Sequence, residues 1–426
     1  MLLFAASQVR AADSPSGKLH VGVASCASAV CHGSLLPREG GNILRNEYVT
    51  WMEKDHHARA YTVLLNERSR SIAKNLGLRA AHESDLCLDC HSTNAPTSAR
   101  GERSLIADGV SCESCHGPAA AWIDSHDDAG RTHAANVKSG LTDLADIGVR
   151  AAVCASCHVG DDRRFVTHRI MAAGHPRTSF ELDTFTHLQP RHYRVDDDYR
   201  SRKGEAPSVV AWSVGQAAVL ADYLERIAGR ASAGAGAWPE FALFDCFSCH
   251  HPIRSDAAGV AGLRSATSLG VPALLRASAT MVALSTEAAG LAKDTRIDPS
   301  LRDLDAALAG RSDEARRLAG EALTRVRLAR RGLAAWKPSV SQLEKLLDSL
   351  AAPPALVSYR GYSDAEQATM AVQAVIASLV ESGAAKGERQ KRLRAALDGL
   401  FAATRSESAF RPEEFAAAMR RVAGVR

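Results

Sequence analysis

The hydrophobic and polar positions of residues 259–426 follow a helical period. Apolar residues recur three and four positions apart, which is the spacing of one face of an α-helix. Ser363 and Glu366 have the spacing of a capping box, and Pro353-Pro354 interrupts the pattern between two segments. We therefore predict a small helical bundle, with helices over residues 271–292, 301–336, 340–350, 363–381 and 386–404 and a last helix from Pro412.

The preceding part of the chain contains less periodic sequence. Residues 47–64 are predicted to form a helix that carries His57, Ala60, Tyr61 and Leu64 on one face. No run of 18 or more apolar residues occurs anywhere in the chain, so the sequence predicts no transmembrane helix.

The N-terminus carries a weak targeting signal. Residues 1–6 are mostly apolar, and Val9-Arg10-Ala11 offers a cleavage site before Ala12. We interpret residues 1–11 as the remnant of a secretory signal peptide, with a disordered N-terminus as the alternative. A periplasmic or secreted protein is therefore expected.

Charge and cysteine content divide the chain at one place. The net charge is +4, with 52 basic and 48 acidic residues, which favours no nucleic-acid partner. Residues 1–258 carry −3 and hold all ten cysteines and all 16 histidines, whereas residues 259–426 carry +7. We predict two domains, residues 12–258 and 259–426. The second domain either shields and stabilises the first domain, or it offers its positive charge as a docking face for an acidic redox partner or a second subunit.

The ten cysteines form five pairs, and a histidine directly follows each pair. Four pairs have the form Cys-x-x-Cys-His, and the first has the form Cys-x4-Cys-His. In chain order the pairs are Cys26 and Cys31, Cys87 and Cys90, Cys112 and Cys115, Cys154 and Cys157, and Cys246 and Cys249. The histidines that follow them are His32, His91, His116, His158 and His250.

This pattern is typical of covalent haem attachment. Two thiols on a short turn add to the vinyl groups of haem, and the next histidine supplies an axial nitrogen to the iron. The two extra residues of the first motif need only bulge the loop. Zinc sites and disulfides are alternatives for paired cysteines, but neither explains a histidine after every pair.

Five covalently bound haem c groups would supply flat apolar core, which fits an aromatic content of only 5%. We expect short helices and loops around the haems, and therefore a mainly α fold for the whole chain. Each iron also needs a second axial ligand for full coordination. The candidates, which lie in helical or small-residue settings or ten residues after a motif, are His57, His126, His168, His175 and His192.

Residues 24–160 resemble the tetrahaem cytochrome c-554 family of ammonia oxidisers. The family has a Trp-x5-His-Ala helix after its first motif, matched here by Trp51 to Ala58. It also has Gly-Val-x-Cys-Glu-Ser-Cys-His-Gly-Pro with a histidine ten residues on, matched by residues 109–118 and His126. The resemblance implies that His126 is the distal ligand of the first haem and that His57 is the distal ligand of the third.

The sequence departs from that family in its longer first motif, its fifth motif and its C-terminal extension. In the family, the second haem is five-coordinate and no histidine follows the fourth motif at an offset of ten. Here His168 occupies that offset, so we expect it to ligate the second haem, at His91. His175 and His192 are then assigned to the fourth and fifth haems.

The sequence therefore predicts a pentahaem c-type cytochrome that transfers electrons between redox partner proteins and has no catalytic residues. The alternative is a multihaem oxidoreductase that acts on a small nitrogen or sulfur compound at one five-coordinate haem. The Cys-x-x-Cys-Lys motif of pentahaem nitrite reductases is absent, and the eight motifs of hydroxylamine oxidoreductases are not reached. Both observations favour the electron carrier. The identity of the partners and the oligomeric state stay open.

Overall fold

The computed structural model describes residues 18–425, apart from residues 162, 230–237, 247–248, 251–273, 275, 292–294, 296, 309–311 and 360. The expected signal peptide and the predicted domain boundary at residue 258 lie outside the described residues. Within them the chain is mainly helical, as predicted, and its β-structure consists of isolated bridges. None of the described helices combines the length and the hydrophobicity that crossing a membrane requires.

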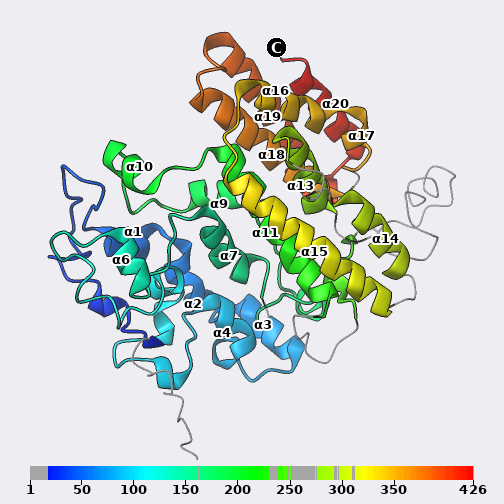
Figure 1. Cartoon of the computed structure of the whole chain (residues 1–426). Helices are drawn as coiled ribbons and strands as arrows, with labels where there is room; N and C mark the ends of the chain where they lie inside the picture. Colours follow the sequence, from blue (N-terminus) through cyan, green and yellow to red (C-terminus); the bar gives the residue numbers. More distant parts are fainter. Residues whose placement is uncertain are drawn as a thin grey trace, which may run out of the picture. The chain divides into compact units, whose positions relative to one another are not determined.

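The chain forms two compact units. Unit 1 comprises residues 1–70, 79–144 and 190–199, and unit 2 comprises residues 71–78, 145–189 and 200–426. Unit 1 holds the first three cysteine motifs. Unit 2 holds the last two motifs together with the C-terminal helices, so those helices share a unit with part of the expected haem-binding region (Figure 1).

Unit 1 consists of short helices joined by loops. Its α-helices are α1 (Glu47–Lys54), α2 (Ala60–Val63), α4 (Asp85–His91), α5 (Cys112–His116) and α6 (His133–Lys138), while α3 (Glu67–Leu76) and α10 (Asp197–Lys203) run across the unit boundary. Its 3-10 turns are η2 (Val23–Ser25), η3 (His56–Arg59), η4 (Ala81–Glu83), η5 (Thr97–Ala99) and η6 (Ile106–Asp108).

The helix predicted over residues 47–64 is interrupted at Asp55. This residue adopts an extended conformation, with ψ 129°, after the end of α1. Its carboxylate accepts a hydrogen bond of 3.0 Å from the backbone N–H of His57 and so caps η3. The prediction of one continuous helix is wrong, because an aspartate can satisfy the backbone donors of a new helical turn with its own side chain.

Unit 2 contains longer helices. The first part contributes α7 (Ile147–His158), α8 (His168–Ala172), α9 (Leu182–Leu188), α11 (Ser208–Ile227) and η7 (Phe241–Leu243). The C-terminal part contributes α13 (Ala277–Ala288), α14 (Asp298–Leu308), α15 (Ser312–Ala334), α16 (Val340–Ala351), α17 (Pro353–Leu356), α18 (Tyr362–Glu381), α19 (Gly387–Ala403), η10 (Glu407–Ala409) and α20 (Pro412–Ala423). The predicted C-terminal helices are confirmed, except that residues 301–336 form parts of two helices, α14 and α15.

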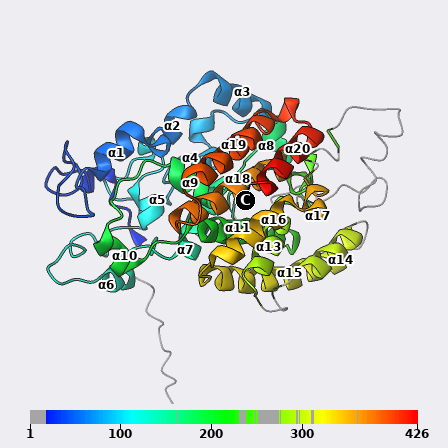
Figure 2. The same ribbon diagram turned by 90° about the horizontal axis from the view of Figure 1, so that it is seen from above.

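Helix α11 forms the core of unit 2. It is apolar nearly all round, which is typical of a buried helix, and Trp212 near its N-terminal end is fully buried. It packs against α7, α9, α13, α15 and α18. Figure 1 shows α15 lying along α11, and Figures 1 and 2 show α19 beside α20. The C-terminal helices therefore pack on the same helix that contacts α7, which carries the fourth motif.

Glycine at position 215 allows α11 to approach α9 closely. A Cβ atom there would lie 2.6 Å from the Cβ of Leu182, well inside van der Waals contact. Only a residue without a Cβ fits this helix crossing.

The capping box predicted at the start of α18 is wrong. No side chain caps this helix, and the Glu366 carboxylate instead accepts hydrogen bonds from Arg177 at 3.1 Å and from the Ser179 hydroxyl at 2.6 Å. A hydrogen bond between two charged groups is stronger than one to a neutral backbone amide. Ser339 and Gln342 form a capping box on α16.

Three carboxyl groups, of the buried Glu181 and the half-buried Asp222 and Asp364, make the stability of unit 2 depend on pH. Burial raises the pKa values of Glu181, Asp222 and Asp364 to about 7. The folded protein therefore binds these protons more tightly than the unfolded chain does. Their contribution to stability is fully present below about pH 4 and is lost as the pH rises through about 7.

The variant Asp364→Asn removes one of these titrations. Between about pH 5 and about pH 8, we expect its apparent free energy of unfolding to fall less than that of the wild type, by on the order of 2 kcal/mol. Urea denaturation of the holoprotein, followed by far-ultraviolet circular dichroism, measures the difference. Asp348→Asn, at an exposed position of α16, is the matched control and keeps the wild-type pH dependence. A wild-type pH dependence in Asp364→Asn contradicts the explanation.

Candidate functional site

The cysteine motifs lie in short helical turns. The second, third and fourth motifs end α4, α5 and α7, and in each case the motif histidine is the last helical residue. In the fifth motif, the backbone N–H of His250 donates to the carbonyl of Cys246 at 2.7 Å, which closes one helical turn. Residues three apart lie on one side of such a turn. The turn therefore presents both cysteines of a pair to the same edge of a ligand.

The cysteines of the motifs differ in exposure, and none of the ten, all of which are described, forms a disulfide. Two are exposed, namely Cys31 and Cys249. The others are half-buried: Cys26, Cys87, Cys90, Cys112, Cys115, Cys154, Cys157 and Cys246. The structure therefore leaves every pair in the thiol form that haem attachment requires, while the thioether bonds themselves stay a prediction.

The second cysteine of each short motif lies one helical turn from its partner. Cys90 follows Cys87 within α4, and Cys115 follows Cys112 within α5. In the fifth motif the backbone N–H of Cys249 donates to the carbonyl of Cys246 at 3.2 Å. The two cysteines of a Cys-x-x-Cys pair therefore lie on one helical turn in each of these three motifs.

The first motif, although two residues longer, also has a hydrogen bond from its histidine N–H to the carbonyl of its first cysteine. The backbone N–H of His32 donates to the carbonyl of Cys26 at 3.3 Å, as His250 donates to Cys246. The inserted loop bulges toward solvent, where Val30 is 73% exposed. A Cβ on Gly33 would lie 2.0 Å from the carbonyl oxygen of Ala27, so this turn requires glycine.

The three motifs of unit 1 lie close to one another. A hydrogen bond between the thiols of Cys112 and Cys26 lowers the pKa of Cys26 and raises that of Cys112. Thr93, which follows the second motif, forms hydrogen bonds with the hydroxyls of Ser111 at 2.8 Å and Ser114 at 2.6 Å. The first three motifs therefore form one contiguous cluster.

Glu113, inside the third motif, fixes the segment that leads into the first. Its buried carboxylate accepts hydrogen bonds from the backbone N–H groups of Val21 at 2.9 Å, Gly22 at 2.8 Å and Ala119 at 2.8 Å. Three backbone donors satisfy a buried carboxylate without a neighbouring cation. Glu113 therefore positions the N-terminal segment against the third motif.

Three pairs of histidine rings lie at similar separations, and each pair joins a motif histidine to one of the predicted distal ligands. The ring centroids lie 6.1 Å apart between His32 and His126, 6.2 Å between His116 and His192, and 6.0 Å between His168 and His250. Two imidazoles that coordinate one metal ion from opposite sides, through bonds of about 2.0 Å, have centroids about 6.3 Å apart. The residues present therefore fit an iron atom between the rings.

The structure places His168 beside the fifth motif, whereas the offset from the fourth motif suggested the second haem. The backbone N–H of His168 donates to the Glu240 carboxylate at 2.7 Å, and its ring lies edge-on to Phe241 at 5.9 Å. These two residues lie shortly before the fifth motif. They hold the start of α8 beside the ring of His250.

His192 lies beside His116, the position that the resemblance gave to His57. An isolated bridge between Ile43 and Tyr193 joins residues 190–199 to the rest of unit 1. Burial lowers the pKa of His192, which favours a neutral imidazole, the form that binds a metal. The carbonyl of His57 accepts from the backbone N–H of Val110 at 3.0 Å, so His57 still lies next to the segment leading into the third motif.

Several of the expected ligands use Nδ1 for a hydrogen bond, an orientation in which Nε2 can bind a metal. Their Nδ1 atoms contact the carboxylates or backbone carbonyls of nearby residues, in the pairs His32–Glu47 (3.0 Å), His57–Asp55 (2.9 Å), His91–Ala60 (3.0 Å), His126–Ile123 (2.5 Å) and His175–Pro176 (2.8 Å). Metal-bound histidines characteristically donate their second ring N–H in this way. His133 has the opposite orientation, because its Nε2 contacts Asp143 at 2.9 Å.

The fourth motif has an aromatic environment. The ring of His158 stacks on Phe180, with centroids 5.6 Å apart, and meets Phe185 edge-on at 5.0 Å. Burial raises the pKa of the Cys154 thiol to about 11. Two aromatic rings beside the motif histidine suit the flat face of a haem.

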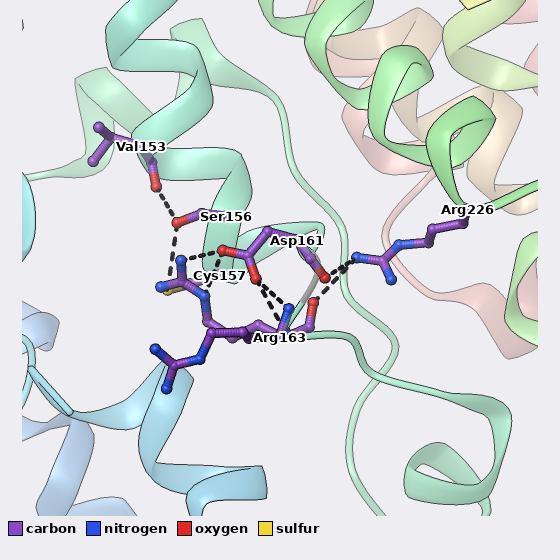
Figure 3. Close-up of polar contacts among 7 residues, drawn as sticks. Val153, Ser156, Cys157, Asp161, Arg163 and Arg226 are labelled. Atoms are coloured by element: carbon purple, nitrogen blue, oxygen red, sulfur yellow. Dashed lines mark hydrogen bonds and ion pairs between the residues drawn. The ribbon is translucent and has the colours of Figure 1, made fainter. Parts of the chain in front are cut away.

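Polar contacts hold Asp161, Arg163 and Arg164 together after the fourth motif (Figure 3). The Asp161 carboxylate accepts from the backbone N–H groups of Arg163 at 2.9 Å and Arg164 at 3.0 Å, and the guanidinium of Arg164 reaches the Cys157 sulfur at 3.2 Å. From α11, Arg226 donates to the carbonyl of Asp161 at 2.7 Å. The loop therefore holds a cation at the second cysteine of this motif.

Sequence reasoning missed the carboxylates that orient the histidines, namely Glu47, Asp55 and Glu240. Glu47 and Asp55 lie at helix starts, where acidic residues are common and give no separate signal. Glu240 acts on a residue more than 70 positions away, which no local pattern reveals.

A compact zinc site, the other alternative for paired cysteines, finds little support in the geometry. Within the described part of the chain, no group of three or more histidine, cysteine, aspartate or glutamate side chains is arranged to hold a metal ion. Zinc in a structural site needs four such ligands around one point.

Comparison with known families gives one match. Residues 25–117 match the family of cytochrome c554 and c-prime, and this segment contains the first three motifs. Over these residues the chain is similar to c-type cytochromes of this family, which supports a haem-based role in electron transfer. Comparison with curated proteins and with solved structures gave no match.

Proposed function

We propose that this chain is a periplasmic or secreted pentahaem c-type cytochrome that carries electrons between redox partner proteins. The observation that carries the proposal is the 6.0–6.2 Å separation between three motif histidines and three other histidine rings. Haem c bound at the motifs supplies a one-electron ferric/ferrous couple.

In this proposal, the cysteines hold each haem by two thioether bonds and the motif histidines bind its iron. The ring separations support His126, His192 and His168 as second ligands at the first, third and fifth haems. His57 and His175 are then left for the second and fourth haems, at His91 and His158. This assignment replaces the pairing inferred from the resemblance at the third haem and the pairing inferred from spacing at the second.

Two imidazole ligands on each iron would explain why the protein transfers electrons and does not catalyse a reaction. They would supply the two ligands that the haem itself leaves to the protein, so a substrate would find no open site on the metal. They also keep the coordination the same in both oxidation states, which favours rapid electron transfer over bond-making chemistry.

The first prediction of this proposal concerns attachment. The intact mass of the purified holoprotein should exceed that of its processed polypeptide by five haems. The double variant with Cys87→Ala and Cys90→Ala should lose one haem and keep four, because the second motif alone is disabled. A mass increment of metal ions only would contradict the proposal in favour of zinc.

The second prediction concerns ligation. His126→Ala removes the second imidazole of the first haem, so one low-spin ferric signal should be replaced by a high-spin signal in electron paramagnetic resonance. His192→Ala should do the same for the third haem. His133→Ala, whose ring is held by Asp143 through Nε2, should leave every low-spin signal in place. Unchanged low-spin signals in His126→Ala and His192→Ala would exclude these two ligands.

The third prediction separates conduction from catalysis. The reduced protein, mixed with nitric oxide, nitrite or hydroxylamine, should show no sustained turnover while its spin state stays low. A soluble electron acceptor should reoxidise the same sample fully. Sustained turnover that stops when a five-coordinate haem is blocked would identify an enzyme instead.

A further inference from the structure

The Glu47 carboxylate links the first motif to the start of α1. Its Oε2 contacts Nδ1 of His32 at 3.0 Å, and its Oε1 accepts from the backbone N–H groups of Leu44 at 2.9 Å and Arg45 at 3.0 Å. The side chain is only 15% exposed. Both oxygens therefore have fixed partners on a largely buried side chain.

The backbone around Glu47 is built to hold this contact. The N–H of Tyr48 donates to the carbonyl of His32 at 3.0 Å, and the N–H of Ser34 donates to the carbonyl of Arg45 at 2.8 Å. Arg45 has φ 61°, and it is the single residue other than glycine with a positive φ in the described part of the chain. This conformation costs about 1–2 kcal/mol and persists where surrounding contacts enforce it.

Two other expected ligands have a weaker acceptor at the same atom, whereas His57, like His32, contacts a carboxylate. Nδ1 of His91 contacts the backbone carbonyl of Ala60 at 3.0 Å, and Nδ1 of His126 contacts that of Ile123. A carboxylate is a stronger acceptor than a carbonyl, because it carries a full negative charge. It therefore makes the imidazole a better electron donor to a metal bound at Nε2. Stronger donation stabilises the ferric over the ferrous state and lowers the reduction potential.

We propose that Glu47, acting through His32, lowers the reduction potential of the first haem. The inference rests on the proposed function, since it requires a haem at the first motif. The residue is a positioning residue, because it touches the ligand and not the iron. With haem bound at the first motif, His32 would hold the iron, and the proton on its Nδ1 would stay in the hydrogen bond to Glu47 in both oxidation states. Glu47 makes the release of an electron from the first haem more favourable.

The test is a potentiometric titration of the holoprotein with Glu47→Gln. The glutamine carbonyl keeps an acceptor for Leu44 and Arg45, while its NH2 group cannot accept from His32. The reduction potential of one of the five haems should rise by about 59 mV. For a one-electron step this corresponds to a tenfold change in the equilibrium constant. Glu53→Gln removes the same charge from an exposed position of the same helix and should leave all five reduction potentials unchanged.

A spectroscopic measurement assigns the shifted step. The low-spin signal that changes in Glu47→Gln should be the one that His126→Ala converts to high spin, because both substitutions act on the first haem. A shift in a different haem overturns the proposal.

The outcomes separate this proposal from the function on which it rests. Five attached haems with five unchanged potentials in Glu47→Gln contradict the role of Glu47 and leave the cytochrome intact. A wild-type protein with fewer than five haems contradicts the proposed function. If Glu47→Gln alone fails to attach the first haem, Glu47→Asp decides. Its carboxylate is one methylene farther from His32, so the potential should rise by less than tenfold, and an unchanged potential overturns the proposal.

Discussion

An imidazole ring held at a fixed distance from a second imidazole is the interaction on which this chain depends. A metal ion binds between two such rings only when both are oriented, and orientation comes from the ring nitrogen that faces away from the metal. For His32 and His126, a carboxylate and a backbone carbonyl supply that contact. Each of the three ring pairs lies within one compact unit, two pairs in unit 1 and one in unit 2. Each unit therefore contains the means to complete at least one site by itself.

The chain combines a segment that is similar to a cytochrome family with C-terminal helices that share a unit with the last two motifs. The family match ends after the third motif, and the fourth and fifth motifs lie in the unit that contains the C-terminal helices. Helix α11 connects the two parts of that unit, because α7 packs on it together with α13, α15 and α18. The C-terminal helices are thus part of the scaffold around the fourth motif, in agreement with a stabilising role.

Local patterns predicted much of the fold and only part of the site. Helical periodicity located the C-terminal helices, and the five motifs follow directly from cysteine spacing. The resemblance placed His126 beside His32. The positions of His168 and His192 could not be predicted, because Glu240 and the bridge between Ile43 and Tyr193 act over long stretches of sequence. The broken helix at Asp55 shows the same limit at short range, since a side-chain cap can override apolar periodicity.

The contact of Glu113 with the N-terminal segment sets the order in which the first site can be completed. Val21 lies 92 positions before the carboxylate that binds its N–H group, and His126 lies farther along the chain still. Contacts between such distant residues form late, because a long loop must close first. During synthesis, the first motif emerges before Glu113, the residue that fixes the segment leading into it. The segment that leads into Cys26 can therefore take its final place only after the third motif has been synthesised.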